Sequence, residues 1–183
     1  ELIYLIKGNK GNKLTFSKNN LMADNIPCPY YYLHKIEIII RNRDFRIFLD
    51  LGCGSGRVID FFNKSSSNKN FIGIEYFEEQ FLYCKEIFKI EKNIKLVQED
   101  FIEHDILQYN ADCYFINDPI KDDITFINVL KKIIGSDHTK KNILLILVQC
   151  SNNILQSLKN IQCIESYYIS DKNGFSIYCI NNK

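Results

Sequence analysis

The sequence predicts a single α/β domain built on a mostly parallel sheet. Short apolar runs alternate with longer segments of helical periodicity through the middle of the chain, and two β-rich runs around an Asn-Gly turn close it. The length of 183 residues is about that of one domain. Strands that alternate with helices form right-handed βαβ units, so we expect helices on both faces of the sheet.

Seven strands are predicted, each as a short run rich in apolar residues. The fifth run is almost continuously apolar, which is typical of a strand buried on both faces. The last two are separated by the Asn-Gly turn and are expected to form an antiparallel hairpin. The predicted strands are 47–51, 71–75, 94–97, 112–117, 142–149, 162–169 and 175–180.

Helices are predicted between these strands, where apolar residues keep helical spacing. They cover 58–62, 77–91 and 121–134, and a further helical pattern runs over 30–40. The first part of the chain differs in character from the alternating part. We expect residues 1–45 to form an N-terminal cap over the open edge of the sheet, and residues 46–183 to form the main domain.

Charge and cysteine content exclude several classes of protein. Lys and Arg number 23 and Asp and Glu 22, whereas a nucleic-acid binder usually carries a basic excess. The seven cysteines form no CxxC pair, which argues against a zinc site and a disulfide scaffold. No apolar stretch reaches the ~20 residues of a membrane helix. We therefore expect a reduced, cytoplasmic protein with no metal and no membrane partner, and the charge balance disfavours a nucleic acid as partner.

The most specific motif is a glycine-rich turn that follows the first predicted strand, Asp50–Gly56 (Asp-Leu-Gly-Cys-Gly-Ser-Gly). Glycine permits positive φ and lets a ligand approach the backbone, whereas a plain strand-to-helix turn often needs only one glycine. The dinucleotide fingerprint would place a glycine at position 57, where Arg57 stands, and no P-loop Gly-Lys-Ser/Thr follows. The turn therefore predicts a ligand site of a different type.

This order, Asp-x-Gly-x-Gly-x-Gly, resembles motif I of the class I S-adenosylmethionine-dependent methyltransferases. The resemblance extends from residue 47 to about residue 120. It implies a Rossmann-like class I methyltransferase fold with a mostly parallel seven-stranded sheet and a C-terminal antiparallel hairpin. It also implies that S-adenosylmethionine binds across Asp50, Gly52, Gly54 and Gly56.

Further residues match the family's positions at the ends of the next strands. Glu75 stands 19 residues after the last glycine, where the family has a carboxylate that accepts hydrogen bonds from the ribose hydroxyls. Asp100 and Phe101 match the adenine-binding positions, and Asn117 and Asp118 match motif IV, near the transferred methyl group. Each alone could be a solvated strand end or a turn residue. Together they fall at the carboxyl ends of successive strands, where open α/β sheets bind ligands.

A narrower resemblance is to the small methyltransferases related to the Dot1 type. Pro27–Tyr30 before a helix is similar to that group's Pro-Thr-Pro-Tyr-like segment, and Asp118–Ile120 to its Asn-Pro-Phe. The departures are Cys28 for Thr, Asp118 for Asn and Ile120 for Phe. An ordinary extended segment before a helix is the alternative for the first of these matches.

Methyl transfer is an in-line displacement at a sulfonium, so holding the reactants in line can supply most of the acceleration. An amine acceptor must first lose a proton, and Asp118 and Tyr30 are the candidate groups. We expect a protein side chain or a small molecule as acceptor, because the chain lacks the Asn/Asp-Pro-Pro-aromatic motif of enzymes that methylate flipped bases. Three alternatives remain. One is a non-catalytic S-adenosylmethionine-binding module or sensor, and a less favoured one is a nucleic-acid methyltransferase. The third is a nicotinamide-dependent oxidoreductase, which Arg57 disfavours.

Overall fold

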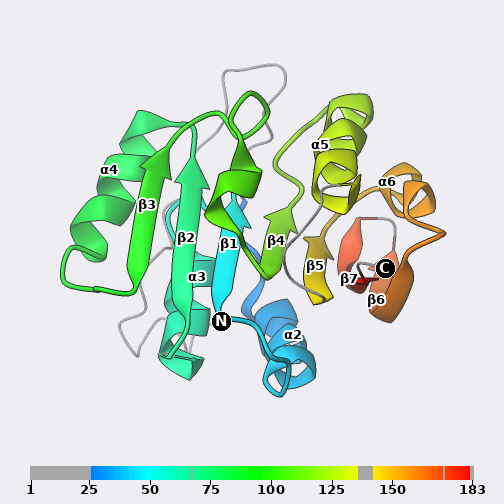
Figure 1. Cartoon of the computed structure of the whole chain (residues 1–183), viewed down its shortest axis with the longest axis horizontal. Helices are drawn as coiled ribbons and strands as arrows, with labels where there is room; N and C mark the ends of the chain where they lie inside the picture. Colours follow the sequence, from blue (N-terminus) through cyan, green and yellow to red (C-terminus); the bar gives the residue numbers. More distant parts are fainter. Residues whose placement is uncertain (1–25, 67, 136–141, 171, 182–183) are drawn as a thin grey trace.

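The computed structural model describes residues 26–66, 68–135, 142–170 and 172–181, and a twisted sheet forms their centre (Figure 1). Its strands are β1 (Ile47–Leu51), β2 (Asn70–Glu75), β3 (Ile94–Gln98), β4 (Cys113–Asn117), β5 (Asn142–Val148), β6 (Gln162–Ser170) and β7 (Asn173–Asn181). They form one seven-stranded sheet in the order β3-β2-β1-β4-β5-β7-β6. The predicted α/β class and closing hairpin are confirmed.

The pairing of the strands identifies the place where such a sheet binds ligands. Strands β1 to β5 pair in parallel, and β7 is inserted antiparallel between β5 and β6. β1 pairs with β2 on one side and with β4 on the other, so the strand order reverses at β1. The carboxyl ends of the strands on either side of this reversal are the usual ligand site of an open α/β sheet.

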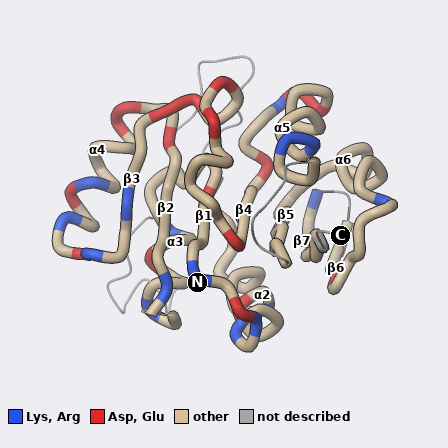
Figure 2. Tube along the Cα trace, in the orientation of Figure 1, with Lys and Arg blue, Asp and Glu red and all other residues tan. Residues whose placement is uncertain are grey.

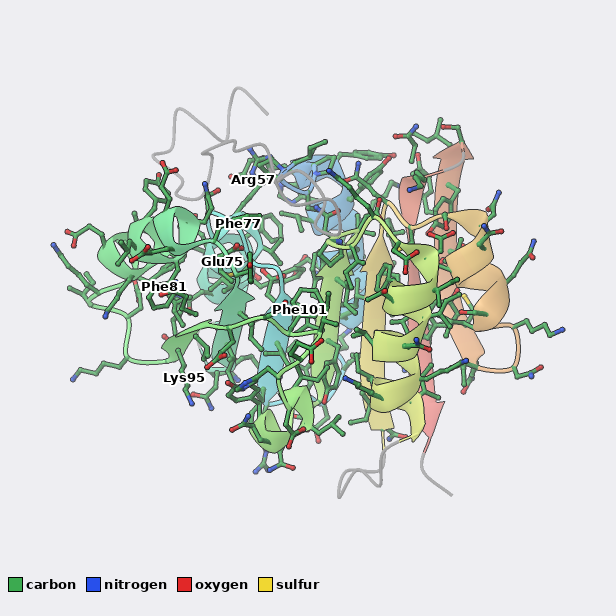
Figure 3. All side chains as sticks on the ribbon, turned by 90° about the horizontal axis from the view of Figure 1, so that it is seen from above. Arg57, Glu75, Phe77, Phe81, Lys95 and Phe101 are labelled. Atoms are coloured by element: carbon green, nitrogen blue, oxygen red, sulfur yellow. The ribbon has the colours of Figure 1, made fainter. Side chains whose placement is uncertain are left out.

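Helices cover both faces of the sheet, as Figure 3 shows from above. One core contains residues of α2 (Tyr30–Ile40), α3 (Arg57–Ser65) and the end of α4 (Glu78–Ile87). The other contains residues of α5 (Asp123–Gly135), α6 (Asn152–Ser157) and the 3-10 helix η1 (Ile106–Tyr109). Within the described ranges, no helix is both long and apolar enough to cross a membrane.

The predicted helix over 30–40 is present as α2, but it lies on a face of the sheet rather than at its edge. Leu33 and Ile36 are fully buried in the same core as Phe48 of β1 and Phe115 of β4. The predicted cap segment 1–45 can be described only from residue 26 onward, because residues 1–25 lie outside the described residues. Its division from the main domain stays a prediction.

The helices differ in detail from the sequence-based expectation: α3 is longer than predicted, and neither η1 nor α6 was predicted. α4 ends at Ile87 rather than at residue 91, because a turn follows in which the Glu91 N–H donates to the Phe88 carbonyl. The short α6 has no counterpart among the predicted helices. Its N-terminus is capped by Ser151, whose Oγ accepts a hydrogen bond from the Ile154 N–H.

Candidate functional site

The glycine-rich turn leaves β1 with three residues in the left-handed region. The φ angles of Gly52, Gly54 and Gly56 are +76°, +53° and +82°, values that side chains with a Cβ rarely adopt. The N–H groups of Gly52 and Cys53 both donate to the Ile74 carbonyl, at 2.9 and 3.0 Å. The turn is therefore tied to β2 at the switch point of the sheet.

At two of the glycines, neighbouring side chains of the protein leave no room for a Cβ. A Cβ at Gly52 would lie 3.0 Å from Cβ of Pro119, and one at Gly56 would lie 2.5 Å from the Phe88 ring. The Gly54 N–H and carbonyl both have partners within the chain. The glycines are therefore required by backbone conformation and close packing, in addition to any ligand that approaches the turn.

Glu75, at the end of β2, braces this turn. Its Oε2 accepts the Gly54 N–H at 2.7 Å and its Oε1 accepts the Phe77 N–H at 2.8 Å; Figure 3 shows Glu75 beside Phe77. The side chain is 5% exposed, and burial raises the pKa of Glu75 against the lowering effect of these hydrogen bonds. An ionised carboxylate can accept about four hydrogen bonds, so acceptor capacity remains for a ligand. The bracing role was not predicted from the sequence.

Two buried acceptor oxygens at the switch point have no hydrogen-bond partner among the described residues. They are Oδ2 of Asp50, in β1, and Oδ1 of Asn117, at the end of the adjacent β4. Burial and the nearby Glu75 carboxylate raise the pKa of Asp50 well above its usual range. A buried polar atom without a partner is costly, and a ligand that donates hydrogen bonds would remove that cost.

The predicted adenine-side residues follow β3. Asp100 forms a turn in which its Oδ1 accepts the Ile102 N–H at 2.9 Å. Phe101 is 2% exposed, and its ring lies 3.9 Å from the position of a Cβ at Gly52. Phe101 therefore packs under the glycine-rich turn, on the same edge of the sheet as Glu75 (Figure 3). Contact with an adenine ring stays a prediction.

The segment that precedes α2 runs along the carboxyl edge of the sheet. Asn117 Nδ2 donates to the Ile26 carbonyl at 2.9 Å, and Arg57 donates to the Cys28 carbonyl at 3.3 Å. The Arg57 guanidinium also lies over the Tyr30 ring, 4.6 Å from its centroid. Tyr30, a predicted catalytic residue, is 3% exposed and packs in the core. From the sequence, Arg57 served only to exclude a dinucleotide site, and its role in holding this segment was missed.

Asp118 follows β4 with an unusual backbone and a basic partner. Its φ is +38°, and its Oδ2 lies 3.4 Å from Nζ of Lys172 in the turn between β6 and β7. Burial raises the pKa of Asp118, whereas the Lys172 ammonium acts in the opposite direction. The structure thus brings together two residues that are 54 positions apart, and no motif in the sequence indicated Lys172.

Acidic residues gather along this carboxyl edge, as the red segments at the top of Figure 2 show. Those at or after the ends of β2 and β3 are Glu75, Glu78, Glu79, Glu99 and Asp100. No group of His, Cys, Asp or Glu within the described part of the chain is arranged to hold a metal ion. The edge is thus an acidic surface with hydrogen-bond acceptors, suited to a ligand that carries donors or positive charge.

No protein-family model matches the chain, and no curated protein sequence matches it significantly. Solved structures match it well. An RNA methyltransferase from Salinibacter ruber in complex with S-adenosyl-L-homocysteine has a TM-score of 0.64 and 12% identity, covering 86% of this chain and 95% of its own. A SAM-dependent methyltransferase from Aquifex aeolicus has a TM-score of 0.58 and 13% identity, covering 84% and 100%.

A third structure, described as a caffeoyl-CoA O-methyltransferase from Staphylococcus aureus, has a TM-score of 0.63 and 16% identity, covering 98% of this chain and 90% of its own. All three align over most of this chain and at least 90% of their own, and the two whose names give an acceptor differ in it. The narrower resemblance to the Dot1 type stays a prediction. The chain has the Rossmann-like fold of the class I S-adenosylmethionine-dependent methyltransferases.

Proposed function

We propose that the protein is an S-adenosylmethionine-dependent methyltransferase whose acceptor is a protein side chain or a small molecule. The observation that carries the proposal is the pair of buried, unpartnered acceptor oxygens of Asp50 and Asn117. Neither oxygen has a partner among the described residues, and the two residues lie on adjacent strands at the switch point of the sheet. S-adenosylmethionine carries an ammonium group and ribose hydroxyls, which are donors of the kind that these oxygens lack.

The residues at this edge fit S-adenosylmethionine. The proposed set comprises the three glycines of the turn with Asp50, Glu75, Asp100, Phe101 and Asn117. Glu75 keeps acceptor capacity for the ribose, and Asp50 supplies a carboxylate oxygen, Oδ2, that has no partner among the described residues. When bound, the cofactor supplies a methyl group on a positively charged sulfur, which the acidic edge would attract.

The chain's own contribution to the reaction is to hold the acceptor in line and to receive its proton. Asp118 is the stronger candidate for the proton acceptor, because it lies at the end of β4 with 26% of its side chain exposed. Tyr30 is the second candidate, and its ring is held by Arg57 within the core. The segment from Ile26 to Tyr30 would then form one wall of the acceptor site.

The charge of this edge disfavours a nucleic acid as the acceptor. A polyanion gains affinity from basic residues, through the counterions that they displace. Acidic residues gather here instead (Figure 2), and the chain as a whole carries a formal charge of only +1. One structural neighbour is named an RNA methyltransferase, but the acidic edge supports a neutral or cationic acceptor for this chain. The seven free cysteines support a reducing compartment such as the cytoplasm.

Binding and transfer can be tested separately. Calorimetry should show binding of S-adenosylmethionine and not of NAD, and NAD binding in its place would support the oxidoreductase alternative. Incubation with a labelled methyl donor and fractionated cell extract should then yield a labelled product. Binding without any labelled product would support the non-catalytic module. The absence of binding to either nucleotide would refute the proposed function.

A further inference from the structure

The turn between β6 and β7 brings a lysine to the carboxyl end of β4. β7 runs antiparallel to β5, and the Gln149 N–H at the end of β5 donates to the Gly174 carbonyl at 2.9 Å. The turn therefore sits beside the ends of β5 and β4, which are paired neighbours. From it, Lys172 places its Nζ 3.4 Å from Oδ2 of Asp118.

Both members of this ion pair have an unusual backbone conformation. Asp118 and Lys172 have φ angles of +38° and +61°, and Gln149 between them in the fold has +57°. Such left-handed conformations are unfavourable for residues other than glycine and are concentrated at functional sites. The two side chains are 26% and 50% exposed, so the pair stands at the rim of the site.

The surroundings of Asp118 oppose its ionisation, apart from Lys172. Burial raises the pKa of Asp118, and the Asp123 carboxylate acts in the same direction. The nearby Cys150 thiol has a pKa raised chiefly by burial, so it is neutral and contributes no charge. Among the described groups that face Asp118, the Lys172 ammonium is the one that favours the carboxylate form.

We propose that Lys172 is a positioning residue for methyl transfer: its ammonium group, 3.4 Å from Oδ2 of Asp118, holds that side chain at the end of β4 and favours its charged form. The proposal rests on the proposed function, in which Asp118 takes a proton from the acceptor. In that step an N–H or O–H bond of the acceptor breaks, its electron pair stays on the acceptor atom, and the proton moves to a carboxylate oxygen of Asp118. A protonated Asp118 could not receive it.

An NMR titration of ¹³C-labelled Asp side chains tests this role without knowledge of the acceptor. The Asp118→Asn variant identifies the Asp118 signal. In Lys172→Met the Asp118 carboxyl should titrate at higher pH than in the wild type, and Lys172→Arg should restore the wild-type curve. Lys159→Met removes an exposed lysine beyond the end of α6 and is the matched control, which should leave the curve unchanged.

The outcomes separate this proposal from the proposed function. An Asp118 titration at the same pH in the wild type and in Lys172→Met overturns the role of Lys172, and so does an equal shift in Lys159→Met. S-adenosylmethionine binding is measured by calorimetry on the same samples, and Lys172→Met should bind within about twofold of the wild type because Lys172 is a rim residue. A wild type that does not bind S-adenosylmethionine overturns the proposed function instead.

Discussion

Asp50→Asn is expected to stabilise the ligand-free protein while weakening its affinity for S-adenosylmethionine. Asp50 is 2% exposed, and its Oδ2 has no hydrogen-bond partner in the described part of the chain. Burial and the Glu75 carboxylate raise the pKa of Asp50 well above its usual range. An amide of the same shape carries no charge, so the substitution removes the cost of ionising a buried carboxyl group.

The stabilisation should grow as the pH rises. A carboxyl group whose pKa is raised by folding holds its proton more tightly in the folded state. Its contribution to stability is complete below the unfolded pKa of about 3.9 and is lost as the pH rises through the folded pKa. Each pH unit in that window lowers the free energy of unfolding of the wild type by up to ~1.4 kcal/mol, whereas the side-chain amide in Asp50→Asn does not titrate. We expect a gain of about 1–3 kcal/mol in the free energy of unfolding at about pH 8, and little difference at about pH 4.

Urea denaturation across this pH range measures the gain, and calorimetry measures the accompanying loss of about 1–3 kcal/mol in S-adenosylmethionine binding. Asp60→Asn is the matched control, because Asp60 is 4% exposed but its Oδ2 pairs with Lys64 at 2.8 Å. It should gain no stability. Equal stability of the wild type and Asp50→Asn at about pH 8, or an unchanged cofactor affinity, would refute the reasoning.

Two further substitutions test the glycine-rich turn. Glu75→Ala removes the acceptor of two backbone N–H groups, including that of Gly54, and should lower both the free energy of unfolding in urea and the calorimetric affinity for S-adenosylmethionine by about 1–3 kcal/mol. Gly56→Ala places a Cβ 2.5 Å from the Phe88 ring at a φ of +82° and should cost about 1–3 kcal/mol. Gly135→Ala, with open space at its Cβ position, should be neutral or stabilising by up to ~1 kcal/mol. Thermal denaturation compares the two glycine variants, and equal stability of both would contradict the packing explanation.

The strands and their order along the chain were predictable because their signals are local. The apolar run 142–149 and the Asn-Gly turn indicate a buried strand and a hairpin without any knowledge of the rest of the fold. The six residues of α6 are too few to show a helical period. The face that α2 covers depends on its packing against β1 and β4, which are distant in the sequence, and the sequence alone led to the edge instead.

The candidate site likewise contains residues that could be predicted from the sequence and residues that could not. Asp50, Glu75 and Asp118 were predicted because each lies at or next to the end of a strand in a recognisable pattern, and the ends of parallel strands meet at one edge. The partners that define their chemistry were not predicted. Lys172 reaches Asp118 across 54 positions, and Arg57 holds the segment before α2 through a carbonyl and a ring. Contacts of this kind depend on the three-dimensional packing and have no signature in residue spacing.

The acidic edge can select a cationic ligand although the chain as a whole is nearly neutral. Two of its carboxylates are held by backbone N–H groups: Glu75 by Gly54 and Phe77, and Asp100 by Ile102. These acceptors are therefore oriented before a ligand arrives, so little of the binding free energy is spent on ordering them. The same backbone donors belong to the turns after β1, β2 and β3, which makes the stability of the turns and the affinity of the site interdependent. Substitutions that loosen these turns should consequently weaken cofactor binding even where they remove no charge.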